Sequence, residues 1–195
     1  MVLLALAALV SGVLWGAFGP DGTPIDLLQI HSDWILYLLM FLVGISVGLH
    51  RGIVQSIKQH HIKIFIIPFG VVAGSIIGGG LAALLVRIPL NQGIAVASGM
   101  GWYSLTGVVL TEMFGATMGS IGFLSNLMRE MLSFFSIPII ARRLNYYTCI
   151  APAGATSEDT TLSMMVRYTD EETVVLSVFN GVICSALVPV ILGVC

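Results

Sequence analysis

The sequence predicts an all-α polytopic membrane protein with about five spanning helices and two broken or re-entrant helical segments. Three observations predict this fold class. Of the 195 residues, 57% are hydrophobic and only 9% are charged, whereas a soluble domain carries about 25% charged residues. The charged residues also separate apolar stretches of about 20 residues, the length that a helix needs to cross a bilayer. This composition excludes a soluble enzyme, a nucleic-acid-binding protein and a secreted disulfide scaffold.

The first part of the chain, residues 1–87, is predicted to hold three spanning helices. We expect them at 1–19, 34–50 and 64–86. In the third helix, small residues recur every four positions and predict a face for close helix packing; they are Gly70, Gly74, Gly78 and Ala82.

The second part, residues 88–195, is predicted to be the transport core. It holds two interrupted segments, 88–115 and 145–169, each followed by a spanning helix. The first reads AVASGMGWYSLTGVVLTE and the second CIAPAGATSEDTTLSMM, each with glycines beside polar residues. Backbone freed from a helix at membrane depth must line a cavity or be buried in protein, because lipid offers it no partner. Ordinary helices kinked by glycine are the alternative.

The distribution of basic residues predicts orientation, because loops rich in Lys and Arg stay cytoplasmic. The loop 51–63 carries Arg51, Lys58 and Lys63, whereas 20–33 has only acidic charges. This places the N-terminus inside. If both interrupted segments are hairpins, Arg142 and Arg143 are cytoplasmic and the C-terminus lies outside. A hairpin plus one crossing, occurring twice, also predicts a possible inverted repeat, as in secondary transporters.

The second interrupted segment carries the strongest functional signal, since charges inside a membrane are costly. Glu158 and Asp159 follow the interruption at Gly154. We expect Thr156 or Ser157 to cap a half-helix that begins near Asp159, whose N-terminus binds an anion such as a carboxylate. The two acids would take a cationic amine or a coupling proton. The alternative is that one of them merely caps the half-helix.

A polar stripe in the helix at 117–141 is the next candidate. Asn126 and Glu130 share a face that should point inward, and Arg129 lies on the adjoining face. Arg129 needs a partner, for which Glu112 or Asp159 is expected. A direct role in substrate binding and a structural ion-pair network remain equal alternatives.

Three residues at the first interruption complete the candidate set: Trp102, Tyr103 and Ser104. The aromatic rings would contact an ammonium group by cation–π interaction, or belong to an interfacial belt. Glu112 closes this segment and is either interfacial or part of the site. His60 and His61 lack a nearby third ligand, so no metal site is expected. No cofactor is expected either.

Five stretches of the chain closely resemble the LysO-type lysine exporter family (Lys_export) of bacteria. They are FLVGISVGL, ASGMGWYSLTGVVLTEMFG, NLMRE, IPIIARR and GATSEDTTL. The resemblance covers essentially the whole chain and corresponds to the C-terminal two-thirds of longer members. It implies a multi-pass exporter of L-lysine and analogues such as thialysine in the bacterial inner membrane. It also implies that Asp159 is the intramembrane acid needed for transport.

The chain departs from the longer members at its start. Those members carry further hydrophobic helices and a second acidic position, whereas His50 and Arg51 follow FLVGISVGL here. We therefore expect a separately encoded small membrane subunit, or a homodimer, to supply the missing helices.

Together these features predict a secondary active exporter of lysine rather than an enzyme. The substrate carboxylate is expected near Ser104 and Ser157, and its ammonium groups at Asp159 and Glu158, with Glu130 in support. Proton antiport is expected, with Na⁺ as the alternative ion. Two other hypotheses are an accessory subunit of a two-chain exporter and an intramembrane hydrolase with paired carboxylates.

Overall fold

The computed structural model describes residues 63–195 continuously, together with residues 7, 10–12, 14, 15, 38, 41 and 45, all of them helical. The spans expected at 1–19 and 34–50, and the loops around them, therefore lie almost wholly outside the described residues. The continuous part belongs to one compact unit, to which the following description applies.

This part of the chain is entirely helical, without a strand between residues 63 and 195. Its elements are α5 (Lys63–Val86), α6 (Leu90–Ser98), α7 (Tyr103–Phe114), α8 (Ala116–Arg143), η1 (Tyr147–Cys149), α9 (Ile150–Ala153), η2 (Gly154–Glu158), α10 (Leu162–Tyr168) and α11 (Glu171–Leu192). Three helices are long and apolar enough to cross a membrane: Phe65–Val86, Ala116–Arg143 and Glu171–Leu192. The predicted fold class, a polytopic helical membrane protein, is confirmed.

Local chemistry explains where the long helices begin and end. α5 ends just before Arg87, whose φ of 62° is left-handed, and Pro89 follows. A single residue, Gly115, separates α7 from α8 with a φ of 89°, a conformation that favours glycine. Asp170 caps the N-terminus of α11, because its carboxylate accepts a hydrogen bond from the Thr173 amide at 2.9 Å. Such a cap satisfies an amide that the helix itself leaves free.

Small residues hold α5 against α6, but not those that the sequence pattern indicated. A Cβ atom added at Gly79 would lie 2.6 Å from the Gly93 carbonyl oxygen and 2.6 Å from Ala97 Cβ. The close contact therefore lies one residue beyond the expected ridge. Within the described part, nothing lies within 4 Å of the Cβ positions of Gly70, Gly74 and Gly78.

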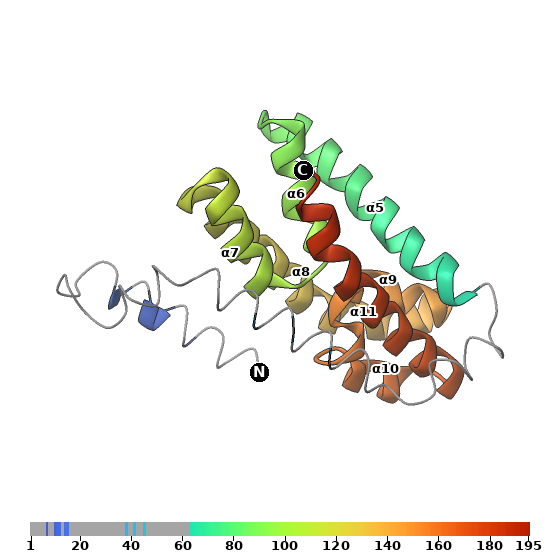
Figure 1. The fold of residues 1–195 in the computed structure, drawn as a ribbon. Helices are drawn as coiled ribbons and strands as arrows, with labels where there is room; N and C mark the ends of the chain where they lie inside the picture. The colour runs from blue at the N-terminus through green and yellow to red at the C-terminus, as the bar shows by residue number, and fades with distance from the viewer. Residues whose placement is uncertain are drawn as a thin grey trace. The chain divides into compact units, whose positions relative to one another are not determined.

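Both interrupted segments fold back on themselves as hairpins. Figure 1 shows α6 running into the middle of the bundle and α7 returning toward the same end. The turn between them brings Thr106 Oγ1 within 2.1 Å of a Cβ position at Gly99. In the second segment, Cys149 and Met165 share one buried apolar cluster, although a straight helix would separate them by about 24 Å. The hairpin alternative thus describes both segments better than kinked spanning helices.

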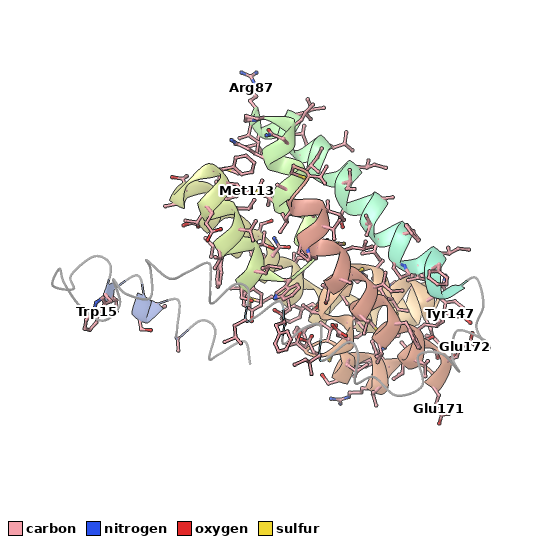
Figure 2. The ribbon with its side chains drawn as sticks, viewed as in Figure 1. Trp15, Arg87, Met113, Tyr147, Glu171 and Glu172 are labelled. Atoms are coloured by element: carbon pink, nitrogen blue, oxygen red, sulfur yellow. The ribbon has the colours of Figure 1, made fainter. Side chains whose placement is uncertain are left out.

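The two hairpins enter the bundle from opposite ends. Arg87, which precedes the first hairpin, lies at one end, and Tyr147, Glu171 and Glu172 lie at the other (Figure 2). There the Tyr147 hydroxyl donates to Glu172 Oε1 at 3.0 Å and ties the second hairpin to α11. Opposite entry is the arrangement that an inverted repeat requires.

Candidate functional site

The first break, residues 99–102, separates α6 from α7 in the interior of the protein. Met100 and Gly101 both have left-handed backbones, with φ values of 48° and 100°. The Trp102 amide closes the turn by donating to the Gly99 carbonyl at 2.8 Å. Met100 is fully buried, so this turn lies within packed protein, as irregular backbone at membrane depth must.

The second break, residues 154–161, differs from the expected half-helix start. α10 begins at Leu162, and Thr161 before it makes no side-chain cap. The expectation that Thr156 or Ser157 caps this half-helix is therefore wrong. The Thr156 hydroxyl instead donates backward to the Ala153 carbonyl at 2.9 Å, because the chain continues as a 3₁₀ turn whose free carbonyls attract hydroxyl groups.

The two breaks touch each other through their backbones. The Ala155 amide donates to the Met100 carbonyl at 2.8 Å, although the two residues are far apart in sequence. Gly154 makes this approach possible, because a Cβ atom there would lie 2.3 Å from the same carbonyl oxygen. Its φ of 60° also favours glycine. Gly154 is therefore needed for the contact between the breaks, and its expected part in the binding site stays a prediction.

An asparagine on the following long helix fastens each break. On α8, Asn126 accepts from the Gly101 amide at 2.8 Å and donates to the Val96 carbonyl at 2.8 Å. On α11, Asn180 donates to the Gly154 carbonyl at 2.8 Å and to Ser157 Oγ at 2.9 Å. Each hairpin is thus hydrogen-bonded at its break to an asparagine of the long helix that follows it, which supports the predicted repeat.

Ser157 is hydrogen-bonded to α11. Its hydroxyl lies 2.8 Å from the Ser177 carbonyl, and the Ser177 hydroxyl donates to the Ser157 carbonyl at 2.7 Å. Both side chains are fully buried. In this conformation Ser157 holds the second break to α11, and its expected contact with a substrate carboxylate stays a prediction.

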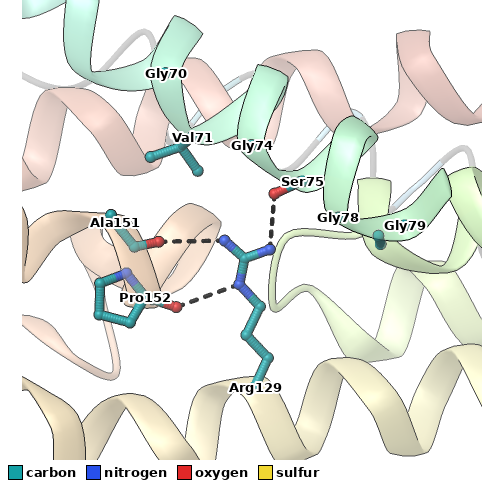
Figure 3. Close-up of a pocket in the computed structure, with 10 residues that line it drawn as sticks. Gly70, Val71, Gly74, Ser75, Gly78, Gly79, Arg129, Ala151 and Pro152 are labelled. Carbon is teal, nitrogen blue, oxygen red and sulfur yellow. Dashed lines mark hydrogen bonds between the residues drawn. The ribbon is translucent and has the colours of Figure 1, made fainter. Parts of the chain in front are cut away.

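Arg129 binds neutral groups rather than the expected carboxylates. Its guanidinium donates to the Pro152 carbonyl at 3.2 Å, to the Ala151 carbonyl at 3.2 Å and to Ser75 Oγ at 2.9 Å (Figure 3). Those carbonyls belong to α9 just before the break, and a cation near a helix C-terminus is favourable. Arg129 thereby stabilises the end of the broken helix.

A cavity of about 480 Å³ surrounds this guanidinium. Small residues of α5 form one wall, and α9 forms another (Figure 3); the lining residues include Gly70, Gly74, Gly78, Arg129 and Pro152. The glycine ridge that sequence analysis assigned to helix packing lines this open space in the described part of the chain.

The two acids of the second break have different surroundings. Glu158 is partly buried, and its Oε1 accepts from the Ser185 hydroxyl of α11 at 3.0 Å. Asp159 is exposed, and its Oδ1 accepts from the amide and hydroxyl of Thr160. Among the described residues, Asp159 has no salt-bridge partner. Asp159 is thus the acid of this pair that is available to a cation.

The polar stripe on α8 points inward, as predicted. Asn126 is 2% exposed, and Glu130 and Ser133 are fully buried. Neither carboxylate oxygen of Glu130 makes a close hydrogen bond among the described residues, and the Thr160 side chain interacts with this carboxylate at longer range. Glu130 nevertheless interacts electrostatically with Asp159, and Tyr103 of α7 interacts with both.

The remaining candidates lie along the first hairpin. Trp102 is partly exposed, and Tyr103 packs edge-on against Phe123 of α8 with ring centroids 5.2 Å apart. Ser104 and Glu112 are both exposed on α7. Of these four, Tyr103 interacts electrostatically with Glu130 of α8 and Asp159 of the second break.

Sequence analysis missed the polar residues of α11, which are Ser177, Asn180 and Ser185. Each contacts the second break. A signal was present, because these residues interrupt the apolar run SVFNGVICSALV at helical spacing.

Comparison with known proteins gives these features a family context. The family model described as "Lysine exporter LysO" matches residues 6–195. The protein named "Lysine exporter LysO" from Escherichia coli (strain K12) is 38% identical over 162 residues, which cover 83% of this chain and 54% of that protein. A "Putative lysine exporter" from Haemophilus influenzae is 35% identical over 189 residues, which cover 96% of this chain and 94% of that protein. The chain thus spans about half the length of the Escherichia coli relative. No solved structure matches the chain.

Proposed function

Since the chain belongs to the Lysine exporter LysO family, we propose that it is a secondary active transporter that exports L-lysine. Related cationic amino acids, including the analogue thialysine, are proposed as further substrates. The proposed mechanism is proton antiport across the bacterial inner membrane, with the N-terminus inside and the C-terminus outside. The names of the two relatives support lysine as the substrate.

One observation carries the proposal: Asp159 presents an exposed carboxylate where two broken helices meet. Transporters place their substrate sites at such breaks, between the halves of a repeat. The Asp159 carboxylate has no salt bridge in the described part of the chain, so it can pair with a substrate ammonium. Such a pairing is strong when the surroundings exclude water.

Transport by the purified chain in proteoliposomes tests the proposal. Vesicles loaded with radiolabelled lysine should lose it when an inward proton gradient is imposed. Asp159→Asn should slow this loss at least about tenfold, equivalent to about 1.4 kcal/mol. Glu171→Gln is the matched control, because Glu171 is an exposed acid in the first turn of α11. Unchanged lysine flux in Asp159→Asn contradicts the proposed role of this carboxylate.

A second candidate function is that of one subunit of a two-chain exporter. The chain covers 54% of the Escherichia coli relative, so a second membrane subunit or a second copy of this chain would supply the rest. Lysine tolerance of cells that express this chain alone, compared with cells that also express a candidate partner, separates the two. Tolerance only with the partner favours the two-chain exporter.

A further inference from the structure

Arg129 is a cation near the middle of a helix long enough to span the membrane. It is partly buried, and its guanidinium enters the space between α5 and α9 (Figure 3). A charge at this depth is costly unless it is paired. Its hydrogen bonds in the described part all go to neutral oxygen atoms, which are the carbonyls of Ala151 and Pro152 and the hydroxyl of Ser75. No carboxylate among the described residues therefore balances its charge.

The sequence outside the described residues provides no acid within an expected span. Residues 1–62 contain three acids, Asp21, Asp26 and Asp33. All three fall in the stretch 20–33, which the charge pattern places in an outer loop. The two spans expected at 1–19 and 34–50 contain no acid. A bound ligand is the remaining source of negative charge at the depth of Arg129.

Hydrogen-bond donors remain available around this charge. A guanidinium carries five N–H groups, and the bonds to Ala151, Pro152 and Ser75 use three of them. The Ser75 hydroxyl accepts from Arg129 and donates to no group in the described part. An arginine beside a hydroxyl donor suits a carboxylate, because the two carboxylate oxygens accept hydrogen bonds from several donors at once.

The cavity beside the guanidinium is large enough for an amino acid. Its volume is about 480 Å³, within the range of about 300–1,000 Å³ that is typical of small-molecule sites. Three glycines of α5 keep it open, because nothing in the described part lies within 4 Å of a Cβ atom added at Gly70, Gly74 or Gly78. Its α9 wall lies directly before the second break, so it is close in the chain to Asp159.

We propose that this cavity binds the α-carboxylate of the exported amino acid, and that Arg129 pairs with it. The inference rests on the proposed function and adds a site for the negative end of a substrate whose ammonium group binds Asp159. The carboxylate accepts from the unused N–H groups of the guanidinium and from the Ser75 hydroxyl. The existing bonds to α9 hold the guanidinium in place. A ligand without the carboxylate leaves the cation unpaired, so the cavity discriminates against it.

Ligand binding to the purified chain tests the inference. L-lysinamide is the probe, because it keeps both amines of lysine but carries a neutral amide in place of the carboxylate. In isothermal titration calorimetry the wild type should bind lysine at least about tenfold more tightly than lysinamide. Arg129→Gln should bind the two ligands with similar affinity. Arg143→Gln changes an exposed arginine in the last turn of α8 and should keep the wild-type preference.

Comparing two ligands in one variant separates carboxylate binding from a purely structural role. If Arg129 only held α9, Arg129→Gln would weaken the binding of both ligands equally, and the preference for lysine would survive. A preference that survives in Arg129→Gln, or equal affinities in the wild type, overturns the inference while lysine flux still supports the proposed function. A wild type that neither binds nor moves lysine contradicts the proposed function, and the inference with it.

Filling the cavity provides a test that leaves Arg129 in place. Gly74→Leu adds a side chain to the cavity wall, where no described atom lies within 4 Å of the new Cβ, so the variant should fold. It should bind lysine at least about tenfold more weakly, equivalent to about 1.4 kcal/mol. Ala73→Leu is the matched control, because Ala73 is the exposed neighbour on α5 and does not line the cavity. Unchanged lysine affinity in Gly74→Leu overturns the inference, even if Arg129→Gln fails to fold.

Discussion

Replacing Asn126 with alanine tests how the first break is held in place. The side chain accepts from the Gly101 amide and donates to the Val96 carbonyl, both at 2.8 Å, and it also lies 2.9 Å from the Gly122 carbonyl. These three hydrogen bonds are buried, and the Asn126 side chain is only 2% exposed. Alanine offers none of these bonds.

The expected cost follows from the groups left behind. Both the Gly101 amide and the Val96 carbonyl lose a partner, and an unsatisfied buried group costs about 1–3 kcal/mol. Asn126→Ala should therefore lower the free energy of unfolding by about 2–6 kcal/mol. A typical hydrogen bond between membrane helices contributes only about 0.6 kcal/mol, because the unfolded chain finds other partners in the membrane. The two estimates are far enough apart to be distinguished.

Reversible unfolding in mixed detergent micelles measures this difference. Ser125→Ala is the matched control, because Ser125 is the exposed neighbour on the same helix, and it should change the unfolding free energy by less than about 0.5 kcal/mol. A loss of only about 0.6 kcal/mol in Asn126→Ala would refute the reasoning, since the break would then not depend on this side chain.

Three further predictions concern the other half of the site. Asn180→Ala should cost a similar free energy of unfolding to Asn126→Ala, about 2–6 kcal/mol; a neutral result would argue against the equivalence of the two halves. Arg129→Gln should lower the unfolding temperature and lysine flux together, because the terminal carbonyls of α9 lose a cation, and normal stability with lost flux would instead indicate direct substrate contact. Gly154→Ala should lower lysine flux at least about tenfold, equivalent to about 1.4 kcal/mol, because its Cβ would lie 2.3 Å from a carbonyl oxygen of the first break. The matched Gly115→Ala has similar backbone strain but no such clash, so equal losses of flux in both would contradict this explanation.

Hydropathy and charge predicted most of the described fold because both act locally. α5, α8 and α11 lie within a few residues of the spans expected at 64–86, 117–141 and 173–195. The inward face of α8 was also predictable, because Asn126 and Glu130 are one helical turn apart in an apolar helix. The glycine-rich stretches indicated where the chain leaves the helix.

The contacts within the site were not predictable, because they join residues far apart in the chain. The hydrogen bond between the Ala155 amide and the Met100 carbonyl is made by backbone groups, which leave no pattern in the sequence. Arg129 was expected to seek an acid, but a broken helix creates free carbonyls that a cation also satisfies. The serine and threonine of GATSEDTT suggested caps, yet whether a hydroxyl donates backward or accepts forward depends on the turn geometry.

The polar candidates differ in whether the fold uses their hydrogen-bonding groups. Asn126, Arg129 and Ser157 each satisfy backbone groups that the breaks leave free. Glu130 satisfies none with its side chain, and Asp159 keeps an exposed carboxylate. The candidates for chemistry are thus the polar groups whose bonding capacity the fold does not use.

A structure of the chain with lysine bound tests the central claim most directly. The account predicts density for the amino acid beside the second break, with its ammonium nitrogen within salt-bridge distance of Asp159 and facing Glu130. Lysine bound elsewhere on the chain, with both carboxyl groups unchanged in their surroundings, would contradict the claim that these two acids form the transport site.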